Sequence, residues 1–212
     1  MQSFIDIAKE LSRGMNITLT IFFVTIFASI PLGLLISFLR ISNKVLKSIS
    51  GFYVWVLRGT PLLLQIYFVY YGLPLFGIVL TDMQAILLAF VLNYAAYLAE
   101  IFRSGIESID KGQYEGATAL GLNKKQTMFL VILPQMVKRV LPPVTNEAIT
   151  LVKDTALASA VAMNDILRIA KGNVSRTGNV SAYIVVAVFY LVLTLILTKA
   201  FSYLEKKAEI KE

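Results

Sequence analysis

The chain consists of long apolar stretches separated by short polar ones. Residues 15–39 contain no charged side chain, and the stretches 49–71, 83–102, 141–163 and 181–203 contain very few. An α-helix needs about 20 consecutive apolar residues to cross the hydrocarbon core of a bilayer, and each stretch is long enough. The pattern therefore predicts an all-α integral membrane protein with five transmembrane helices.

The polar stretches suggest how the chain is organised. Residues 1–14 have an amphipathic pattern, and we expect this segment to lie along the membrane interface. Residues 15–203 form a single transmembrane domain with a cytoplasmic loop at 104–140, and residues 204–212 form a cytoplasmic tail. Within the polar segment 164–180, a short helix is expected at 165–171.

The distribution of lysine and arginine predicts the orientation. These residues follow the first apolar stretch, fill the connection between the third and fourth, and recur in the tail, but none follows the second stretch. Because short cytoplasmic loops are enriched in Lys and Arg, we expect the N-terminus outside and the C-terminus in the cytoplasm. Arg168, Lys171 and Arg176 would then face outside, where they could bind an acidic partner.

The composition excludes several kinds of chemistry. Hydrophobic residues make up 57% of the chain and charged residues 16%, against about 25% charged in soluble domains. There is no cysteine or histidine, which rules out disulfides, thiol nucleophiles and histidine bases and leaves no basis for a zinc site. The net charge of +7 comes from bases that flank apolar stretches, so it favours contact with membrane lipid over nucleic acid. We expect no enzymatic activity.

A polar segment between the third and fourth apolar stretches predicts two helices joined by a tight turn. Residues 115–120 favour a helix, and Gly121 suits the position after a helix where φ is positive. Asn123 is a good N-cap for the second helix. Pro134 lacks an amide donor, so we expect the second helix to end or bend there.

This segment resembles the cytoplasmic loop of ATP-binding-cassette importer permeases of type I, through Glu115-x-Ala117-x-x-x-Gly121 followed by Ile132-x-Pro134. The wider chain, over residues 17–203, is similar to the polar amino acid branch of that family. The motifs that carry this similarity are Arg58-Gly59-Thr60-Pro61-Leu62-Leu63-Leu64-Gln65, Ala99-Glu100-Ile101-Phe102-Arg103, Leu141-Pro142-Pro143, Asn146-Glu147 and Lys153-Asp154-Thr155.

The resemblance implies partners and a location. The first helix of the loop would dock on an ATPase subunit through Tyr114, Glu115, Gly116, Ala117, Ala119, Leu120 and Gly121. Two such ATPases would use ATP and Mg, which this chain does not bind because it has no phosphate-binding Gly-x-x-x-x-Gly-Lys-Ser/Thr loop. A second permease, in a homodimer rather than a heterodimer, and an extracytoplasmic substrate-binding protein would complete the importer in a prokaryotic cytoplasmic membrane.

Two acids in the fourth apolar stretch are candidates for substrate binding. A charge at membrane depth costs at least about 2.5 kcal/mol, so such residues tend to be functional. Glu147 and Asp154 are seven residues apart, with Thr150 between them on the same helical face. They could hold an ammonium or guanidinium group, which predicts a cationic amino acid such as arginine, lysine or histidine. The alternatives are glutamine or glutamate as substrate, or a structural network of these acids with Arg58 or Lys153.

Other polar residues lie at membrane depth. Arg58, Gly59 and Thr60 precede Pro61, so the helix is expected to break there and line a cavity, unless Arg58 instead extends to the interface. Asn93 and Tyr94 lie mid-helix, and Asn93 needs either a neighbouring helix or a ligand as partner.

Two further expectations follow from the sequence. Glu100 and Arg103 are spaced for a local ion pair at the end of the third helix. An ion-coupled secondary transporter is the less favoured function, because no inverted repeat is evident.

Overall fold

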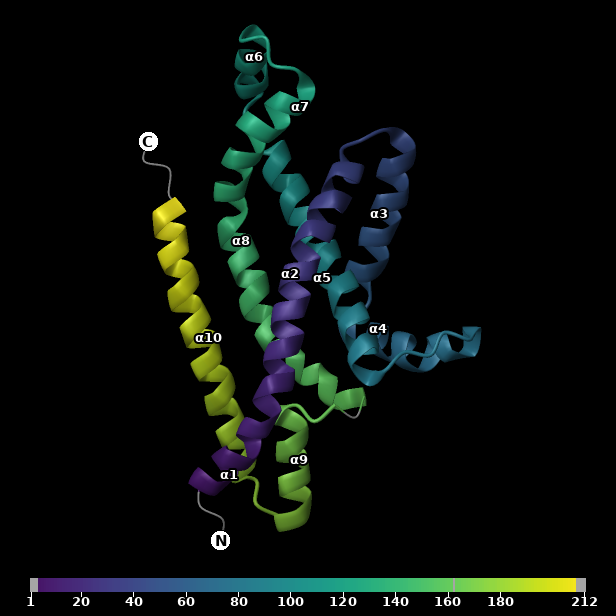
Figure 1. Ribbon diagram of the computed structural model, residues 1–212, viewed down its shortest axis with the longest axis vertical. Helices are drawn as coiled ribbons and strands as arrows, with labels where there is room; N and C mark the ends of the chain where they lie inside the picture. The colour runs from purple at the N-terminus through teal and green to yellow at the C-terminus, as the bar shows by residue number, and fades with distance from the viewer. Residues whose placement is uncertain (1–3, 162, 209–212) are drawn as a thin grey trace.

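The structure is a computed structural model that describes residues 4–161 and 163–208, and every element in these ranges is helical (Figure 1). The all-α prediction is therefore confirmed. The α-helices are α1 (Phe4–Leu11), α2 (Met15–Arg40), α3 (Lys44–Gly59), α4 (Leu62–Tyr67), α5 (Asp82–Glu107), α6 (Lys111–Ala119), α7 (Lys124–Thr127), α8 (Leu133–Asp154), α9 (Ile166–Thr177) and α10 (Ser181–Ala208).

Four helical segments are long and apolar enough to cross a membrane, and a bent pair brings the total to five. The four are Phe4–Arg40, Asp82–Glu107, Lys124–Val161 and Ser181–Lys207. The bent pair joins Lys44–Gly59 to Leu62–Phe76 at an angle of 105°. Figure 1 shows α4 turning away from α3, nearly across the direction of the other long helices. The second predicted helix is thus a broken span or a re-entrant segment.

Helices α2 and α5 pack closely along the centre of the molecule. Gly33 makes this possible, because a Cβ atom there would lie 2.9 Å from the Cβ of Leu98 and 3.1 Å from the carbonyl oxygen of Ala95. Ser29 of α2 donates a hydrogen bond to the carbonyl of Val91 at 3.2 Å. Small residues at a helix interface allow such contact, which is the usual way in which transmembrane helices associate.

A second cluster holds the N-terminal helix against α9 and α10. Ile7 and Leu11 are fully buried there, and Gly14 lies so close to α9 that a Cβ would be 2.5 Å from the amide nitrogen of Ile166. Ile7 and Leu11 of the apolar face of α1 therefore pack on protein, whereas Phe4 on that face is exposed. Its location at the membrane interface stays a prediction.

The short helix expected at 165–171 is present and continues to Thr177 as α9. The carboxylate of Asp165 caps it by accepting hydrogen bonds from the amides of Leu167 and Arg168. Arg176, which we expected to be available to an acidic partner, forms an ion pair with Glu10 of α1. Asn173 donates to the same carboxylate at 2.8 Å, so the ends of α1 and α9 are joined by polar contacts.

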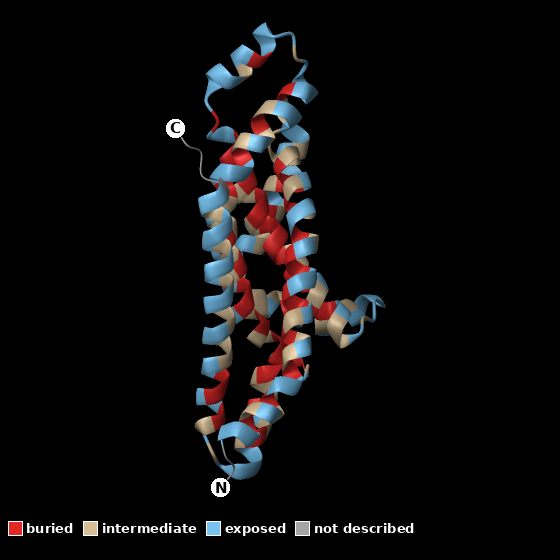
Figure 2. Ribbon diagram, turned by 60° about the vertical axis from the view of Figure 1, so that its left-hand side comes forward, coloured by how far each residue is buried: buried red, intermediate tan, exposed pale blue. Residues whose placement is uncertain are grey.

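The outer face of α10 is apolar and exposed along most of its length (Figure 2). Its exposed residues include Ile184, Val188, Leu191 and Leu195. A large exposed apolar surface on a helix of this length is typical of a lipid-facing transmembrane helix.

The boundaries of the third and fourth predicted helices were wrong. Helix α5 continues to Glu107 rather than ending at residue 102, and the fourth long helical segment begins at Lys124 rather than at residue 141. Pro134 does not end that segment. A π-helical turn, Met128–Ile132, comes directly before α8, so Pro134 lies in the first turn of α8, where a missing amide donor costs little.

The tight turn before this helical segment is as expected. Gly121 has φ = +79°, and Asn123 caps α7 in a capping box with Gln126. Helix α6 and this turn lie at the end of the molecule farthest from α1 and α9 (Figure 1). The end of α10 points toward the α6 side, so the two described chain ends lie on opposite sides. Which side is cytoplasmic stays a prediction.

Candidate functional site

All eight residues that the sequence singled out for substrate binding line one cavity of 570 Å³. The cavity lies between the α3–α4 break, α5 and α8. The break contributes Arg58, Gly59 and Thr60, α5 contributes Asn93 and Tyr94, and α8 contributes Glu147, Thr150 and Asp154. Apolar walls come from Leu62, Leu63 and Leu157.

The break between α3 and α4 follows from Pro61. With no amide hydrogen, Pro61 cannot donate to the carbonyl of Leu57 four residues earlier. Two side chains satisfy that oxygen instead: Gln65 donates through Nε2 at 2.8 Å, and Asn93 donates through Nδ2 at 3.0 Å. The hydroxyl of Thr60 donates to the carbonyl of Val56 at 2.8 Å. The broken backbone is therefore hydrogen-bonded within the protein, as membrane depth requires.

Gln65 has a structural role that the sequence did not lead us to expect. Its Nε2 also donates to the carbonyl and the hydroxyl of Thr60, at 3.0 and 2.8 Å, and its Oε1 accepts from Asn93 at 3.0 Å. It thus links α4, the break and α5. The available signal was its position, a lone amide in an apolar run four residues after a proline. Asn93 finds its partners on the neighbouring helix, one of the two alternatives considered.

The two acids of α8 have different surroundings. Asp154 accepts a hydrogen bond from the hydroxyl of Tyr94 at 2.8 Å. Within the described chain, Glu147 has no hydrogen bond, and neither acid forms an ion pair with Arg58 or Lys153. The structural network that we considered as an alternative is therefore not formed. Two partly buried carboxylates face the cavity, and in a site of low dielectric an unpaired carboxylate attracts a cation strongly.

Arg58 contacts an aromatic ring rather than an acid. Its guanidinium lies 5.1 Å from the ring centre of Tyr97, a cation–π distance. The sequence reasoning missed Tyr97, although it lies four residues after Asn93 and three after Tyr94, on the same face of α5. That spacing was the signal that could have found it.

The α6-side ends of α2 and α5 carry a network of paired charges. Glu100 pairs with Arg103 as expected, and it also pairs with Arg40 of α2 at 3.3 Å. Arg103 pairs in addition with Glu107. Each carboxylate here has a cationic partner, so this cluster joins helices rather than offering a free charge.

The predicted coupling helix α6 projects from the bundle. Leu120 directly follows it and is 82% exposed, whereas Ala117 is 4% exposed. Gln135 of α8 donates a hydrogen bond to Oε1 of Gln113 at 2.9 Å and so links α6 to α8. Partial burial raises the pKa of the Tyr114 hydroxyl above its usual value. The described residues contain no cluster of three or more acids that could hold a metal ion.

Comparison with protein families identifies this architecture. Residues 13–210 match the model of the binding-protein-dependent transport system inner membrane component. The chain belongs to this family. As a member of it, the permease is a multi-pass protein of the inner membrane and a non-catalytic subunit, and the hydrolysis of ATP belongs to a separate ATPase.

Three curated relatives are similar over nearly the whole chain. The arginine transport system permease protein ArtQ of Bacillus subtilis (strain 168) is 40% identical over 198 residues, covering 92% of this chain and 90% of the relative. The probable amino-acid ABC transporter permease protein YckA of the same organism is 39% identical, covering 92% and 87%. The putative glutamine transport system permease protein GlnP of Rickettsia bellii (strain RML369-C) is 35% identical, covering 92% and 91%.

Solved structures share the fold. A chain of an amino acid ABC transporter crystallised with histidines superimposes with a TM-score of 0.89 at 34% identity, covering 98% of this chain and 99% of that one. The inward-facing MetNI methionine ABC transporter gives a TM-score of 0.81 at 22% identity, covering 95% and 97%, and supports the fold alone. The prediction of a type I importer permease is confirmed.

Proposed function

We propose that this permease translocates a polar, cationic amino acid, with arginine, lysine or histidine as its substrate. The observation that carries the proposal is the pair of carboxylates, Glu147 and Asp154, that face one 570 Å³ cavity without an ion-pair partner in the described chain. One acid suits the α-ammonium group that every amino acid carries. The second suits a cation on the side chain.

The surroundings of the two acids support a division of roles. The hydroxyl of Tyr94 donates a hydrogen bond to Oδ2 of Asp154 at 2.8 Å, and this contact orients the carboxylate. Glu147 lies nearer the Arg58 end of the cavity, without a hydrogen bond in the described chain. Arg58, held by the ring of Tyr97, is the cation in this cavity available to a substrate carboxylate. The hydroxyls of Thr60 and Thr150 complete the polar lining.

Uptake of glutamine or glutamate by the same machinery is the second candidate. The similarity to a glutamine permease of Rickettsia, at 35% identity, favours it, as does the neutral amide of Asn93 in the cavity wall. However, the Asn93 amide is already engaged, because its Nδ2 donates to the carbonyl of Leu57 and to Oε1 of Gln65. A neutral side chain would also leave one carboxylate without a counter-charge, which costs free energy in a partly buried site.

The proposed function requires a complete importer around this permease. Two copies of this permease would form a homodimer, two ATPase subunits using ATP and Mg would dock on residues 114–121, and an extracytoplasmic binding protein would deliver the substrate. The projecting α6, with the exposed side chain of Leu120 beside it, supports this docking. The N-terminus would lie outside and the C-terminus in the cytoplasm, in agreement with the positive-inside rule.

The test is uptake by the assembled importer in proteoliposomes, compared between wild type and Glu147→Gln. We expect the variant to lose roughly tenfold or more in the apparent affinity for arginine, the weight of one charge-assisted contact, while basal ATPase activity stays the same. Glutamine uptake should change less. Glu205→Gln, which removes an acid from the α10 tail, is the matched control.

Two results would count against the proposal. Unchanged arginine affinity in Glu147→Gln would remove this residue from the site. Wild-type transport of glutamine in preference to arginine, with no competition by lysine or histidine, would favour the second candidate.

A further inference from the structure

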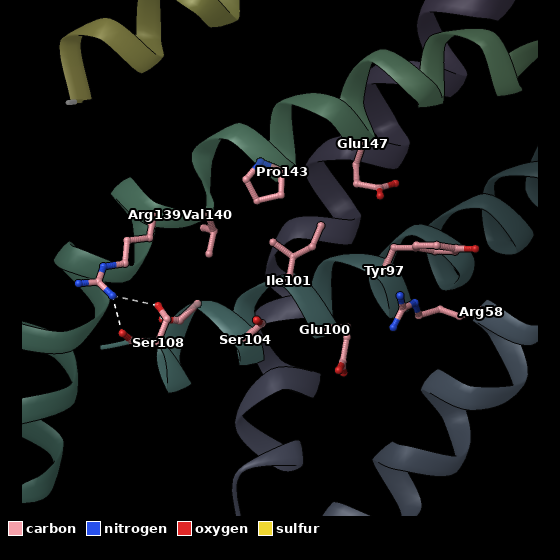
Figure 3. A pocket seen from close by; sticks show the side chains of 11 residues that line it. Arg58, Tyr97, Glu100, Ile101, Ser104, Ser108, Arg139, Val140, Pro143 and Glu147 are labelled. Carbon is pink, nitrogen blue, oxygen red and sulfur yellow. Dashed lines mark hydrogen bonds between the residues drawn. The ribbon is translucent and has the colours of Figure 1, made fainter. Parts of the chain in front are cut away.

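A second cavity adjoins the first on the side toward α6. It has a volume of 350 Å³ and lies in the groove between α5 and α8 (Figure 3). The two cavities share Arg58, Tyr97 and Glu147. Beyond these, the lining of the inner cavity follows one stripe of α5, through Glu100, Ser104 and Ser108. These residues recur at intervals of four, so they lie on one helical face.

The walls of the inner cavity are held by a close contact between α5 and α8. A Cβ on Gly105 would lie 2.2 Å from Cγ1 of Val140 and 3.0 Å from Cγ of Met136. The glycine therefore lets the helices touch behind the cavity. Gly105 and Val140 themselves line the cavity, so this contact forms part of its wall.

The charges of this cavity are arranged asymmetrically. Glu147, at one end, has no hydrogen bond and no cation within ion-pair distance in the described chain. Arg139, at the other end, donates to the backbone carbonyl and hydroxyl of Ser108 but forms no ion pair among the described residues. Glu100 lies between them but is neutralised by Arg103 and Arg40. An unpaired acid and an unpaired base thus face the two ends of one groove.

The spacing suits a long cationic amino acid. Glu147 and Arg139 are eight residues apart on α8, or about 12 Å along the helix axis. The two side chains lie at opposite ends of the groove, with the guanidinium of Arg139 directed toward Ser108 (Figure 3). An extended arginine or lysine likewise carries its side-chain cation and its α-carboxylate at opposite ends.

We propose that the inner cavity is a second binding site for the amino acid, with its side-chain cation at Glu147 and its carboxylate at Arg139, Ser104 and Ser108. Arg58 stacked on Tyr97 divides this inner site from the outer one. Arg58 lies in the last turn of α3, directly before the break, and the space at Gly59 is open, since no atom lies within 4 Å of a Cβ placed there. The inference rests on the proposed transport of a cationic amino acid.

The chain contains no cysteine, so single cysteines can report on each cavity without background. Thr150→Cys reports on the outer cavity and Ser104→Cys on the inner one. The rate of labelling by a small charged thiol reagent is measured on the assembled importer in nanodiscs, with and without arginine, and with glutamine in a parallel series. We expect arginine to slow labelling at both positions.

Substitution of Arg139 separates the two sites. In Arg139→Gln, protection of Ser104→Cys by arginine should require about tenfold more arginine, because one hydrogen bond to a charged group is lost, whereas protection of Thr150→Cys should stay unchanged. Arg139→Lys should restore part of the protection. Lys138→Gln is the matched control, since Lys138 is exposed on α8 beside Arg139 and lines neither cavity.

The outcomes distinguish this inference from the proposed function. Protection of Thr150→Cys without protection of Ser104→Cys would overturn the inner site and leave the proposed function standing. Equal loss of protection at both positions in Arg139→Gln would also overturn it, because the residue would then act on the whole fold. Protection of neither position by arginine, but of Thr150→Cys by glutamine, would overturn the cationic substrate and the inner site together.

Discussion

Two groups of charged residues lie close together on α5 and α8 but have opposite surroundings. On the α6 side, Glu100 contacts two arginines, one from its own helix and one from α2. On α8, Glu147 has no hydrogen bond and no ion pair in the described chain, and it lines both cavities. The first acid joins helices, and the second is left free at a cost in folding free energy.

The difference shows how this fold separates stability from function. A partly buried charge is stable when it is paired, and the paired cluster fixes the ends of α2 and α5. An unpaired acid at membrane depth destabilises the fold, and it is typically retained where a ligand or ion uses it. We therefore expect substitutions in the two groups to change the stability of the fold differently.

The largest expected effect is on stability. Glu100→Gln should lower the free energy of unfolding by about 3 kcal/mol, because it leaves Arg40 without a carboxylate in a partly buried place and removes one of the two carboxylates that pair with Arg103. Glu147→Gln should leave stability unchanged or raise it, because it removes an unpaired charge. Thermal unfolding of the detergent-solubilised chain measures both. Destabilisation of equal size in the two variants would show that Glu147 is stabilised by its surroundings as much as Glu100 is.

A smaller effect is expected at a third acid, which is neither ion-paired nor free. Asp165 is fully buried and caps α9, and burial raises the pKa of its carboxyl to about 6. Because this pKa lies above the value of an unfolded aspartate, the carboxyl favours the folded state at low pH. That contribution is lost as the pH rises through about 6.

The pH dependence gives the test. Between about pH 4 and pH 7, stability should fall by on the order of 2 kcal/mol on account of Asp165. In Asp165→Asn this dependence should disappear, because asparagine keeps an oxygen acceptor for the amides of Leu167 and Arg168 but does not titrate in this range. Melting temperatures recorded at each pH for both proteins measure it. An unchanged pH profile in the variant would assign the dependence to other groups.

The smallest effect concerns two glycines that border the cavities. Gly105→Ala should destabilise the fold by about 1 to 2 kcal/mol, since its new methyl group would overlap the side chain of Val140. Gly59→Ala should change stability by less than about 0.5 kcal/mol, because no neighbouring atom lies within 4 Å. Denaturation of the two variants side by side measures the difference. Equal destabilisation would show that the contact behind the inner cavity is not rigid.

Much of the candidate site was accessible from the sequence because its residues share faces of helices. The spacing of Glu147, Thr150 and Asp154 placed them on one stripe, and Pro61 indicated a break beside Arg58. All of these residues line the same cavity. The positions of Gln65 and Tyr97 offered a signal, but their partners depend on which helix lies opposite, and a single stretch of sequence does not contain that information.

The helix boundaries show a similar limit. Pro134 was expected to end or bend a helix, but the π-helical turn before it places it in the first turn of α8. A local rule gives the cost of a missing amide donor, whereas the preceding turn decides whether that donor is needed.

Local sequence is enough to predict the membrane-spanning helical class, the break at Pro61, the turn at Gly121 and the polar residues at membrane depth. Each depends on local chemistry, namely hydropathy, a missing amide hydrogen or a backbone angle that glycine tolerates. The pairing of charges between helices depends on the packing. Glu100 pairs with Arg40, sixty residues earlier in the chain, because α2 and α5 pack side by side, whereas Glu147 lines a cavity and has no cationic side chain within ion-pair distance in the described chain.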